Sequence, residues 1–147
     1  MRMRSIISRE TVAYWQKKGT LSVALGEGGK DGVVFERGGR ATLTLDIKKR
    51  QEVTRRALIL LMRRFVREAI AKRYASAVCD LAAWRFPHLG MSDEELAELL
   101  AVNFEMANFS FTDFLTRPKE DFPELRTLVF VNADSQIVRH AIKRGQT

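Results

Sequence analysis

A stretch without glycine or proline, residues 48–86, constrains the fold of this chain more than any other feature. Such a stretch predicts one helix, or two helices with a break between them. Apolar side chains recur in it at helical spacing and share one face, formed by Leu58, Leu61, Met62, Phe65 and Ala69. We expect this face in a hydrophobic core and the opposite face in solvent.

The chain before residue 48 follows two other patterns. Residues 9–18 are expected to form a short helix that Ser8 caps and Gly19 ends. Three segments then have the alternation or length of strands and are separated by glycine-rich turns, which predicts a three-stranded antiparallel meander. These segments are residues 20–25, 33–37 and 41–47, with the turns at 26–32 and 38–39.

The chain after the long stretch also has clear boundaries. Ser92 and Glu95 form a capping box, which predicts a helix from this point to about Ala107. Residues 125–131 are expected to form a strand, and residues 134–144 a last helix. The fold class is therefore α+β, with helices packed over a sheet. Residues 1–147 are expected to form one domain with a basic half (1–86) and an acidic, phenylalanine-rich half (87–147).

Charge is distributed unevenly along the chain, whose net charge is +7 and whose isoelectric point is near 10. Residues 1–75 hold 18 Lys plus Arg and 7 Asp plus Glu, a net +11, whereas residues 76–147 hold 7 and 11, a net −4. This polarity favours either a polyanionic partner or head-to-tail contacts between copies. A basic protein without a nucleic-acid partner is the alternative.

Basic residues lie opposite the apolar face of the expected long helix. Lys49, Arg56, Arg63 and Arg67 form a stripe, and Arg55 and Arg64 widen it. Between residues 48 and 73, only Glu52 and Glu68 oppose the cations. Because such a face repels itself, we expect it to contact nucleic-acid phosphates. The alternatives are contacts with the acidic half of this chain or of another copy.

Two acidic residues lie at the ends of expected strands. Asp31 precedes the second strand, and Asp46 ends the third, two residues before Lys48. In the simplest interpretation Asp31 is a turn residue and Asp46 caps the long helix.

Residues 8–60 also resemble the PD-(D/E)xK nuclease superfamily, the restriction-endonuclease-like fold, in an acid before one strand and an acid-x-Lys triplet on the next. The resemblance implies that Asp31 and Asp46 hold a Mg²⁺ ion against the scissile phosphate and that Lys48 stabilises charge or orients water. Glu10 would match an extra acid that some members carry.

Other features limit the class of protein. The longest apolar run, residues 57–62, is far shorter than the roughly 20 residues of a membrane span, and residues 1–7 lack the apolar segment of a secretory signal. The single cysteine, Cys79, lies among apolar residues and is expected to be a buried thiol. We therefore expect a cytoplasmic protein in a reducing compartment.

Three functions follow from these features. The leading hypothesis is a non-catalytic nucleic-acid-binding or nucleoprotein-assembly subunit, without a cofactor, whose acidic half packs on another copy or on a partner. The second is the metal-dependent nuclease. The third is a protein-interaction adaptor or inhibitor whose basic face binds an acidic protein, which would require an exposed apolar patch beside the charge.

Overall fold

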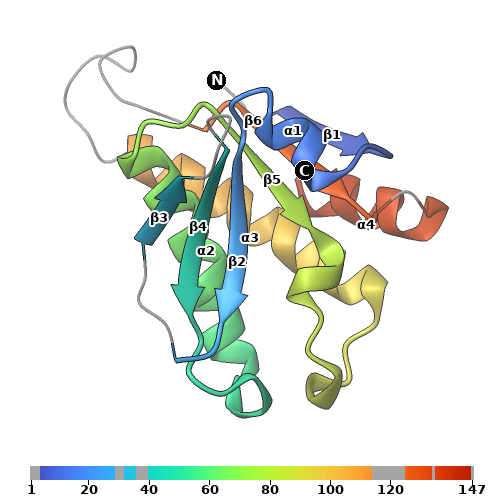
Figure 1. The fold of residues 1–147 in the computed structure, drawn as a ribbon. Coiled ribbons are helices and arrows are strands. Elements are labelled where there is room, and N and C mark those ends of the chain that lie inside the picture. Colours follow the sequence, from blue (N-terminus) through green and yellow to red (C-terminus); the bar gives the residue numbers. More distant parts are fainter. Residues whose placement is uncertain (1–3, 29–31, 36–39, 114–124, 134, 147) are drawn as a thin grey trace.

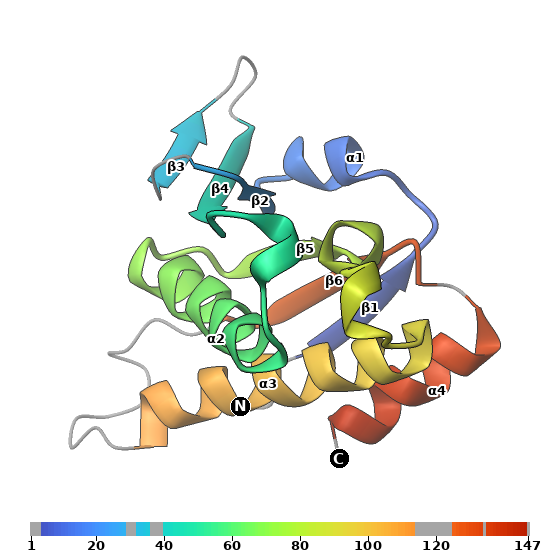
Figure 2. The ribbon, with the colours of Figure 1, turned by 90° about the horizontal axis from the view of Figure 1, so that it is seen from below.

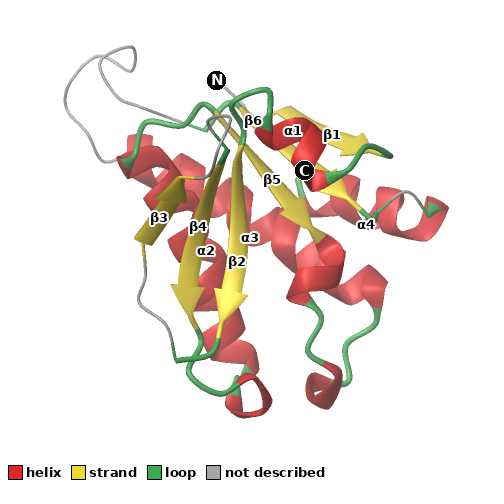
Figure 3. Ribbon diagram, viewed as in Figure 1, coloured by secondary structure: helices red, strands yellow, loops and turns green. Residues whose placement is uncertain are grey.

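Six strands form one sheet in the computed structural model, which describes residues 4–28, 32–35, 40–113, 125–133 and 135–146 (Figure 1, Figure 3). Their order in the sheet is β1-β6-β5-β2-β4-β3. The strands are β1 (Arg4–Ser8), β2 (Leu21–Gly26), β3 (Gly32–Phe35), β4 (Ala41–Asp46), β5 (Ser76–Asp80) and β6 (Thr127–Val131). The helices are α1 (Val12–Gln16), α2 (Arg55–Ala71), α3 (Asp93–Asp113) and α4 (Gln136–Gly145), with short 3-10 helices η1 (Arg50–Glu52), η2 (Leu81–Trp84) and η3 (Pro87–Leu89).

The combination of a sheet with packed helices confirms the α+β class, but the antiparallel meander is wrong. Strands β2 and β4 are parallel neighbours, with Val23 opposite Leu43. Strand β3 pairs antiparallel with the outer side of β4 and forms the sheet edge. The alternation in β4 correctly predicted which side chains are buried, because alternation determines the face of a strand. It does not determine the partner strand or its direction.

Helices cover the two faces of the sheet unequally. Helices α2, α3 and α4 lie on one face and the short α1 on the other (Figure 2). Alternate residues of β5 and β6 divide between these sides: Cys79 and Phe130 belong to the large core, whereas Val78 and Val129 belong to a small cluster. Trp15 packs against that small cluster. The main core therefore lies under α2, α3 and α4.

The stretch without glycine or proline contains a strand that the sequence analysis missed. Helix α2 ends at Ala71, and Arg73 adopts a left-handed conformation with φ +62°. Strand β5 follows and pairs in parallel with β6 and β2. Parallel strands require crossover connections: α2 supplies the one from β4 to β5, which lies on the other side of β2, and α3 the one from β5 to its neighbour β6. A helix throughout residues 48–86 was therefore wrong.

The start of the chain also differs from the prediction. Residues 4–8 form β1 beside β6, so the first helix begins later, after Thr11, whose side chain accepts a hydrogen bond from the N–H of Tyr14. Ser8 does not cap a helix; its Oγ accepts hydrogen bonds from Glu10 N and from Trp15 Nε1. Gly19 (φ +85°) follows the helical turn, as expected.

The second half follows the prediction closely. Ser92 Oγ accepts a hydrogen bond from Glu95 N at 3.1 Å, which confirms the start of α3, although this helix continues past Ala107 to Asp113. Strand β6 lies within the expected residues 125–131. Helix α4 occupies the expected last helix and has Ser135 as its N-cap.

Candidate functional site

Helix α2 has the amphipathic pattern that its sequence predicts. Thr54 caps it, with Oγ1 accepting a hydrogen bond from Ala57 N at 3.1 Å. All five apolar residues of the predicted core face are buried: Leu58, Leu61, Met62, Phe65 and Ala69. Lys49 is not part of this helix, because it lies in an extended segment before η1. Its assignment to the helical stripe was therefore wrong.

The solvent side of α2 carries a basic face, which we define as Arg55, Arg56, Arg64 and Arg67, all exposed. Among the described residues, no carboxylate lies within ion-pair distance of Arg55, Arg56 or Arg67. The only acidic residue of the helix, Glu68, pairs with Lys72 at 3.5 Å. The basic face is thus a concentrated positive charge that solvent reaches directly.

Arg63 differs from these four arginines. It is half-buried, and its Nε donates a hydrogen bond to Asn103 Oδ1 of α3 at 3.0 Å. Asn103 is itself buried and donates to the carbonyl oxygen of Leu99. Arg63 therefore joins α2 to α3 through its Nε, a contact that none of the four arginines of the basic face is shown to make.

One side of α2 borders a hollow with a volume of about 360 Å³. One wall is a ridge of the helix, and the other is the segment between β4 and α2. We call it the α2 hollow; it is lined by Asp46, Ile47, Lys48, Lys49, Glu52, Val53, Ala57, Leu60, Leu61 and Arg64. It brings two lysines of the preceding segment beside an arginine of the helix. The sequence did not predict this hollow.

Of the two acids in the proposed nuclease site, the structure describes Asp46, whereas Asp31 lies outside the described residues. Asp46 Oδ1 accepts hydrogen bonds from Gly28 N at 3.0 Å and from Lys48 N at 2.8 Å. Asp46 therefore joins the end of β4 to the loop after β2, and the expectation that it caps the long helix was wrong, since Thr54 does so. Lys48 is exposed and has φ +61°.

The nuclease hypothesis requires side chains that can hold a metal ion. No group of three or more His, Cys, Asp or Glu side chains within the described ranges is arranged to hold a metal ion. Because these ranges omit Asp31, they do not test the nuclease arrangement. Of the two acids in that arrangement, Asp46 lies within the described residues, where it accepts hydrogen bonds from two backbone N–H groups.

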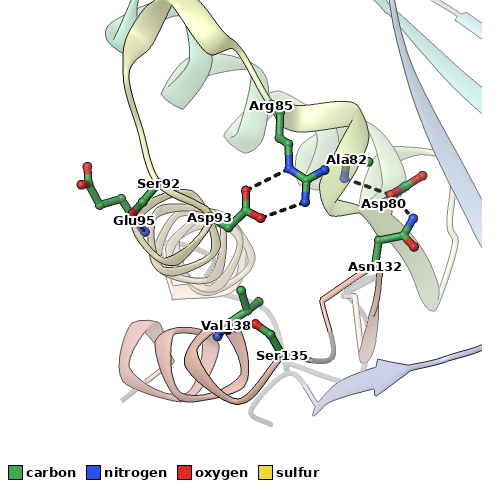
Figure 4. A network of polar contacts seen from close by, with 9 residues as sticks. All are labelled: Asp80, Ala82, Arg85, Ser92, Asp93, Glu95, Asn132, Ser135 and Val138. Atoms are coloured by element: carbon green, nitrogen blue, oxygen red, sulfur yellow. Dashed lines mark hydrogen bonds and ion pairs between the residues drawn. The ribbon is translucent and has the colours of Figure 1, made fainter.

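The carboxyl ends of five parallel strands meet at one edge of the sheet, as their parallel pairing requires. Asp80 ends β5, and its Oδ1 accepts hydrogen bonds from Ala82 N at 3.0 Å and from Asn132 Nδ2 at 2.7 Å (Figure 4). Asn132 follows β6 and has φ +57°. This contact joins the loops after two neighbouring strands.

Arg50 connects the loops on the other part of this edge. Its backbone N–H donates to Glu27 Oε1 at 2.7 Å, and its Nη2 donates to the carbonyl oxygens of Ala83 and Arg85 at 2.9 and 2.7 Å. Its guanidinium lies 4.3 Å from the centre of the Phe86 ring. Sequence analysis missed this role, because the partners are two carbonyl oxygens and a glutamate distant in sequence.

Arg85 makes a bidentate contact with Asp93 in the first turn of α3, with Nε and Nη2 at 2.9 and 2.8 Å from its two carboxylate oxygens (Figure 4). The hydrogen bond to Asp93 raises the pKa of Arg85. Both side chains are nearly half exposed, so water screens this ion pair. It fixes the segment after β5 to α3.

Cys79 is fully buried on β5, as its sequence environment predicted. Burial raises the pKa of its thiol well above the usual value, and the negative charge of Asp80 adds to this effect. The thiol therefore stays protonated at neutral pH and is a core residue.

These elements, a mixed sheet with helices on both faces, define a fold that also occurs as one part of larger enzymes. The chain is similar to a tomato leucine aminopeptidase mutant (TM-score 0.69, 12% identity) over 98% of its own length and 35% of that chain. It is similar to the bottromycin maturation enzyme BotP in two structures (TM-scores 0.54 and 0.57, 16% and 15% identity) over 85% of its length and 28% and 29% of those chains.

The chain thus spans about a third of the length of each structure, and at these identities the likeness shows the fold alone. None of these three is named as a nuclease. No family model matches the chain, and no curated protein sequence does. Within the part of the chain that the structure describes, no helix is long and apolar enough to cross a membrane.

Proposed function

We propose that this protein is a non-catalytic binding module that contacts nucleic-acid phosphates through the basic face of α2. One observation supports it most directly: Arg55, Arg56 and Arg67 are exposed on one helix, and no carboxylate of the described residues lies within ion-pair distance of them. Phosphates bound there would relieve the repulsion between neighbouring guanidinium groups. Lys48 and Lys49 extend the positive charge from the helix to the segment after β4.

The proposed contact depends on charge rather than base sequence. Arginines on one exposed helix face can contact successive phosphates of a strand, and such contacts carry no sequence information. We propose that the protein acts in the cytoplasm, where a buried protonated thiol such as Cys79 is compatible with reducing conditions. Assembly into homo-oligomers or with a partner protein through the acidic half is part of the same proposal.

The test is fluorescence anisotropy with labelled single- and double-stranded DNA and RNA at several salt concentrations. If four arginines each meet one phosphate, the slope of log K against log salt is on the order of −3 to −4. The triple variant Arg55→Gln/Arg56→Gln/Arg67→Gln is expected to flatten this slope by about 2 to 3 while the circular dichroism spectrum stays the same.

A matched control removes the same charge elsewhere. Arg4, Arg126 and Lys143 are exposed and lie outside α2, and their replacement by Gln is expected to change the slope much less. Equal losses in the two triple variants would mean that net charge, and not the α2 face, determines binding. Binding without salt dependence would contradict the proposal.

The nuclease alternative is tested with the same substrates. It requires cleavage with Mg²⁺ or Mn²⁺ that stops with a chelator and in Asp46→Asn, while binding is kept. Under the binding-module proposal no cleavage occurs with any metal. Metal-dependent products that Asp46→Asn abolishes would replace the proposal with the nuclease.

A further inference from the structure

Leu60 is an exposed apolar residue on α2. The apolar residues of the core face are buried, yet the side chain of Leu60 is 55% exposed. It lines the α2 hollow, on the same ridge of the helix as Ala57, Leu61 and Arg64. What distinguishes Leu60 is its place: it adjoins the aliphatic surface that Ile47, Val53, Ala57 and Leu61 contribute to the hollow, so the apolar surface there is continuous.

The lining of the α2 hollow combines aliphatic residues, of which Ile47, Val53 and Leu61 are buried, with charged residues that are mostly exposed. Ile47, Val53, Ala57, Leu60 and Leu61 supply the aliphatic surface. Pockets that hold ligands have volumes of roughly 300–1,000 Å³, so about 360 Å³ suits one or two side chains better than a large cofactor. The lining contains no aromatic ring on which a nucleic-acid base could stack.

The rim contains charges of both signs. Lys48, Lys49 and Arg64 are cationic, whereas Asp46 and Glu52 are anionic. A peptide complements both signs, because its carboxylates bind the cations and its backbone N–H groups can donate to Glu52. A phosphodiester backbone has no N–H group, and its phosphates are repelled by the two carboxylates. The basic face of α2 beside the hollow adds attraction for an acidic peptide.

From this geometry we infer that the α2 hollow is a docking site for an acidic peptide segment of a partner protein that inserts one aliphatic side chain beside Leu60. The site goes beyond the proposed nucleic-acid contact, because its apolar anchor is Leu60, although Lys48, Lys49 and Arg64 border both surfaces. The inserted side chain removes Leu60 from water, and the flanking carboxylates of the peptide meet Lys48 and Lys49. Affinity then depends on one apolar position as well as on charge.

The experiment compares two fluorescein-labelled pentapeptides by anisotropy. Both have two glutamates on each side of a central residue, which is leucine in one and glutamine in the other. The expected result is that the parent protein binds the leucine peptide about 10-fold tighter, since burial of an aliphatic side chain contributes on this scale. Because both peptides carry the same four glutamates, the ratio of their two affinities does not depend on the attraction between opposite charges.

Two variants test whether the preference for the leucine peptide arises at Leu60. In Leu60→Gln, which alters a largely exposed side chain, the tenfold preference is expected to fall to about one. In the matched control Arg67→Gln, on the same helix but outside the hollow lining, both affinities fall while the preference is kept. Circular dichroism and urea titration are expected to show both variants as stable as the parent, because both side chains are exposed.

Three results would overturn the inference. The first is equal affinity of the parent for the two peptides, and the second is a leucine preference that survives in Leu60→Gln. The third is weaker oligonucleotide binding in Leu60→Gln, which would assign the hollow to nucleic acid. The proposed nucleic-acid function is tested by a different measurement, the salt dependence of oligonucleotide binding in the arginine triple variant. Either proposal can therefore fail without the other.

Discussion

The surface of α3 and α4 differs from the surface of α2 in whether its arginines form ion pairs with carboxylates of the described residues. On α3 and α4, Arg144 lies 2.7 Å from Glu94 and 3.7 Å from Glu98, so cations and carboxylates meet within the chain. On α2, Arg55, Arg56 and Arg67 meet no carboxylate of the described residues. Under the proposed function, the arginines of α2 bind a partner, whereas the charges of α3 and α4 connect these two helices.

The first turns of the two helices show the same contrast. Helix α3 begins with Asp93, Glu94 and Glu95, which suit the positive end of a helix dipole. Helix α2 begins with Arg55 and Arg56, which oppose it. The first turn of α3 therefore carries charges that favour a helix N-terminus, whereas the first turn of α2 carries charges that disfavour it.

The largest expected effect comes from the core that both surfaces share. Phe104 of α3 is fully buried and has its ring 5.5 Å from that of Phe65 of α2 and 6.0 Å from that of Trp84. Phe104→Ala is expected to lower the free energy of unfolding by about 3–5 kcal/mol, measured by urea titration. Met106→Ala on the same helix is the control and should change it by less than about 1 kcal/mol, because Met106 is 48% exposed. Similar losses for the two variants would show that the aromatic cluster does not dominate the core.

The contact between α3 and α4 gives the next effect. A Cβ atom at Gly145 would lie 2.7 Å from the carbonyl oxygen of Glu98 and 2.8 Å from Ala101 Cβ. Gly145→Ala is expected to cost about 1–3 kcal/mol, because a backbone atom cannot move aside easily. Lys143→Ala, on an exposed position of α4, is the control. If Gly145→Ala raised stability, as helix propensity alone favours, the close packing of these helices would be refuted.

The N-caps test whether the two helices differ at their starts. Ser92 and Thr54 accept the same kind of hydrogen bond, each at 3.1 Å. Ser92→Ala and Thr54→Ala are each expected to lower the free energy of unfolding by roughly 0.5–2 kcal/mol without changing the salt slope of nucleic-acid binding. A change in the slope for Ser92→Ala would place α3 in the binding surface. An unchanged stability would show that the cap is not needed.

Reversing a charge in the first turn of α2 or of α3 is expected to change the free energy of unfolding least, and in opposite directions in the two helices. Arg55→Glu is expected to raise stability by about 0.3–1 kcal/mol, because it places a carboxylate at the positive end of α2 and reduces repulsion. Glu95→Lys is expected to lower stability by a similar amount in α3. Thermal unfolding at low ionic strength measures both, and high salt should reduce both differences. A loss of stability in Arg55→Glu would mean that Arg55 serves the fold.

The sequence predicted faces and helix starts better than it predicted neighbours. The apolar face around Phe65 and the capping box at Ser92 are local features, and both are confirmed. Strand β5 was missed because Arg73, rather than a glycine, supplies the left-handed residue before it. The parallel pairing of β2 with β4 depends on contacts between distant segments, which local alternation does not contain.

In the candidate site, too, local features were predicted and features that depend on distant segments were not. The arginines of α2 were predicted because helical spacing places them on one face, but the departure of Arg63 toward Asn103 depends on where α3 packs. Lys49 was misplaced because the helix was expected to begin too early, before Thr54. The α2 hollow has walls from two segments, so no single periodic pattern predicts it.

The pairing between β2 and β5 has a mechanical consequence. Only two residue pairs join these strands, Leu21 with Ala77 and Ser22 with Val78, whereas β5 and β6 are paired along their whole length. The sheet therefore consists of two well-bonded ribbons, β1-β6-β5 and β2-β4-β3, connected by a narrow seam. Deformation of the sheet concentrates at this seam, since few backbone hydrogen bonds resist it there. The two ribbons are therefore held together mainly by side chains of the shared core, such as Leu21 and Cys79, rather than by backbone hydrogen bonds.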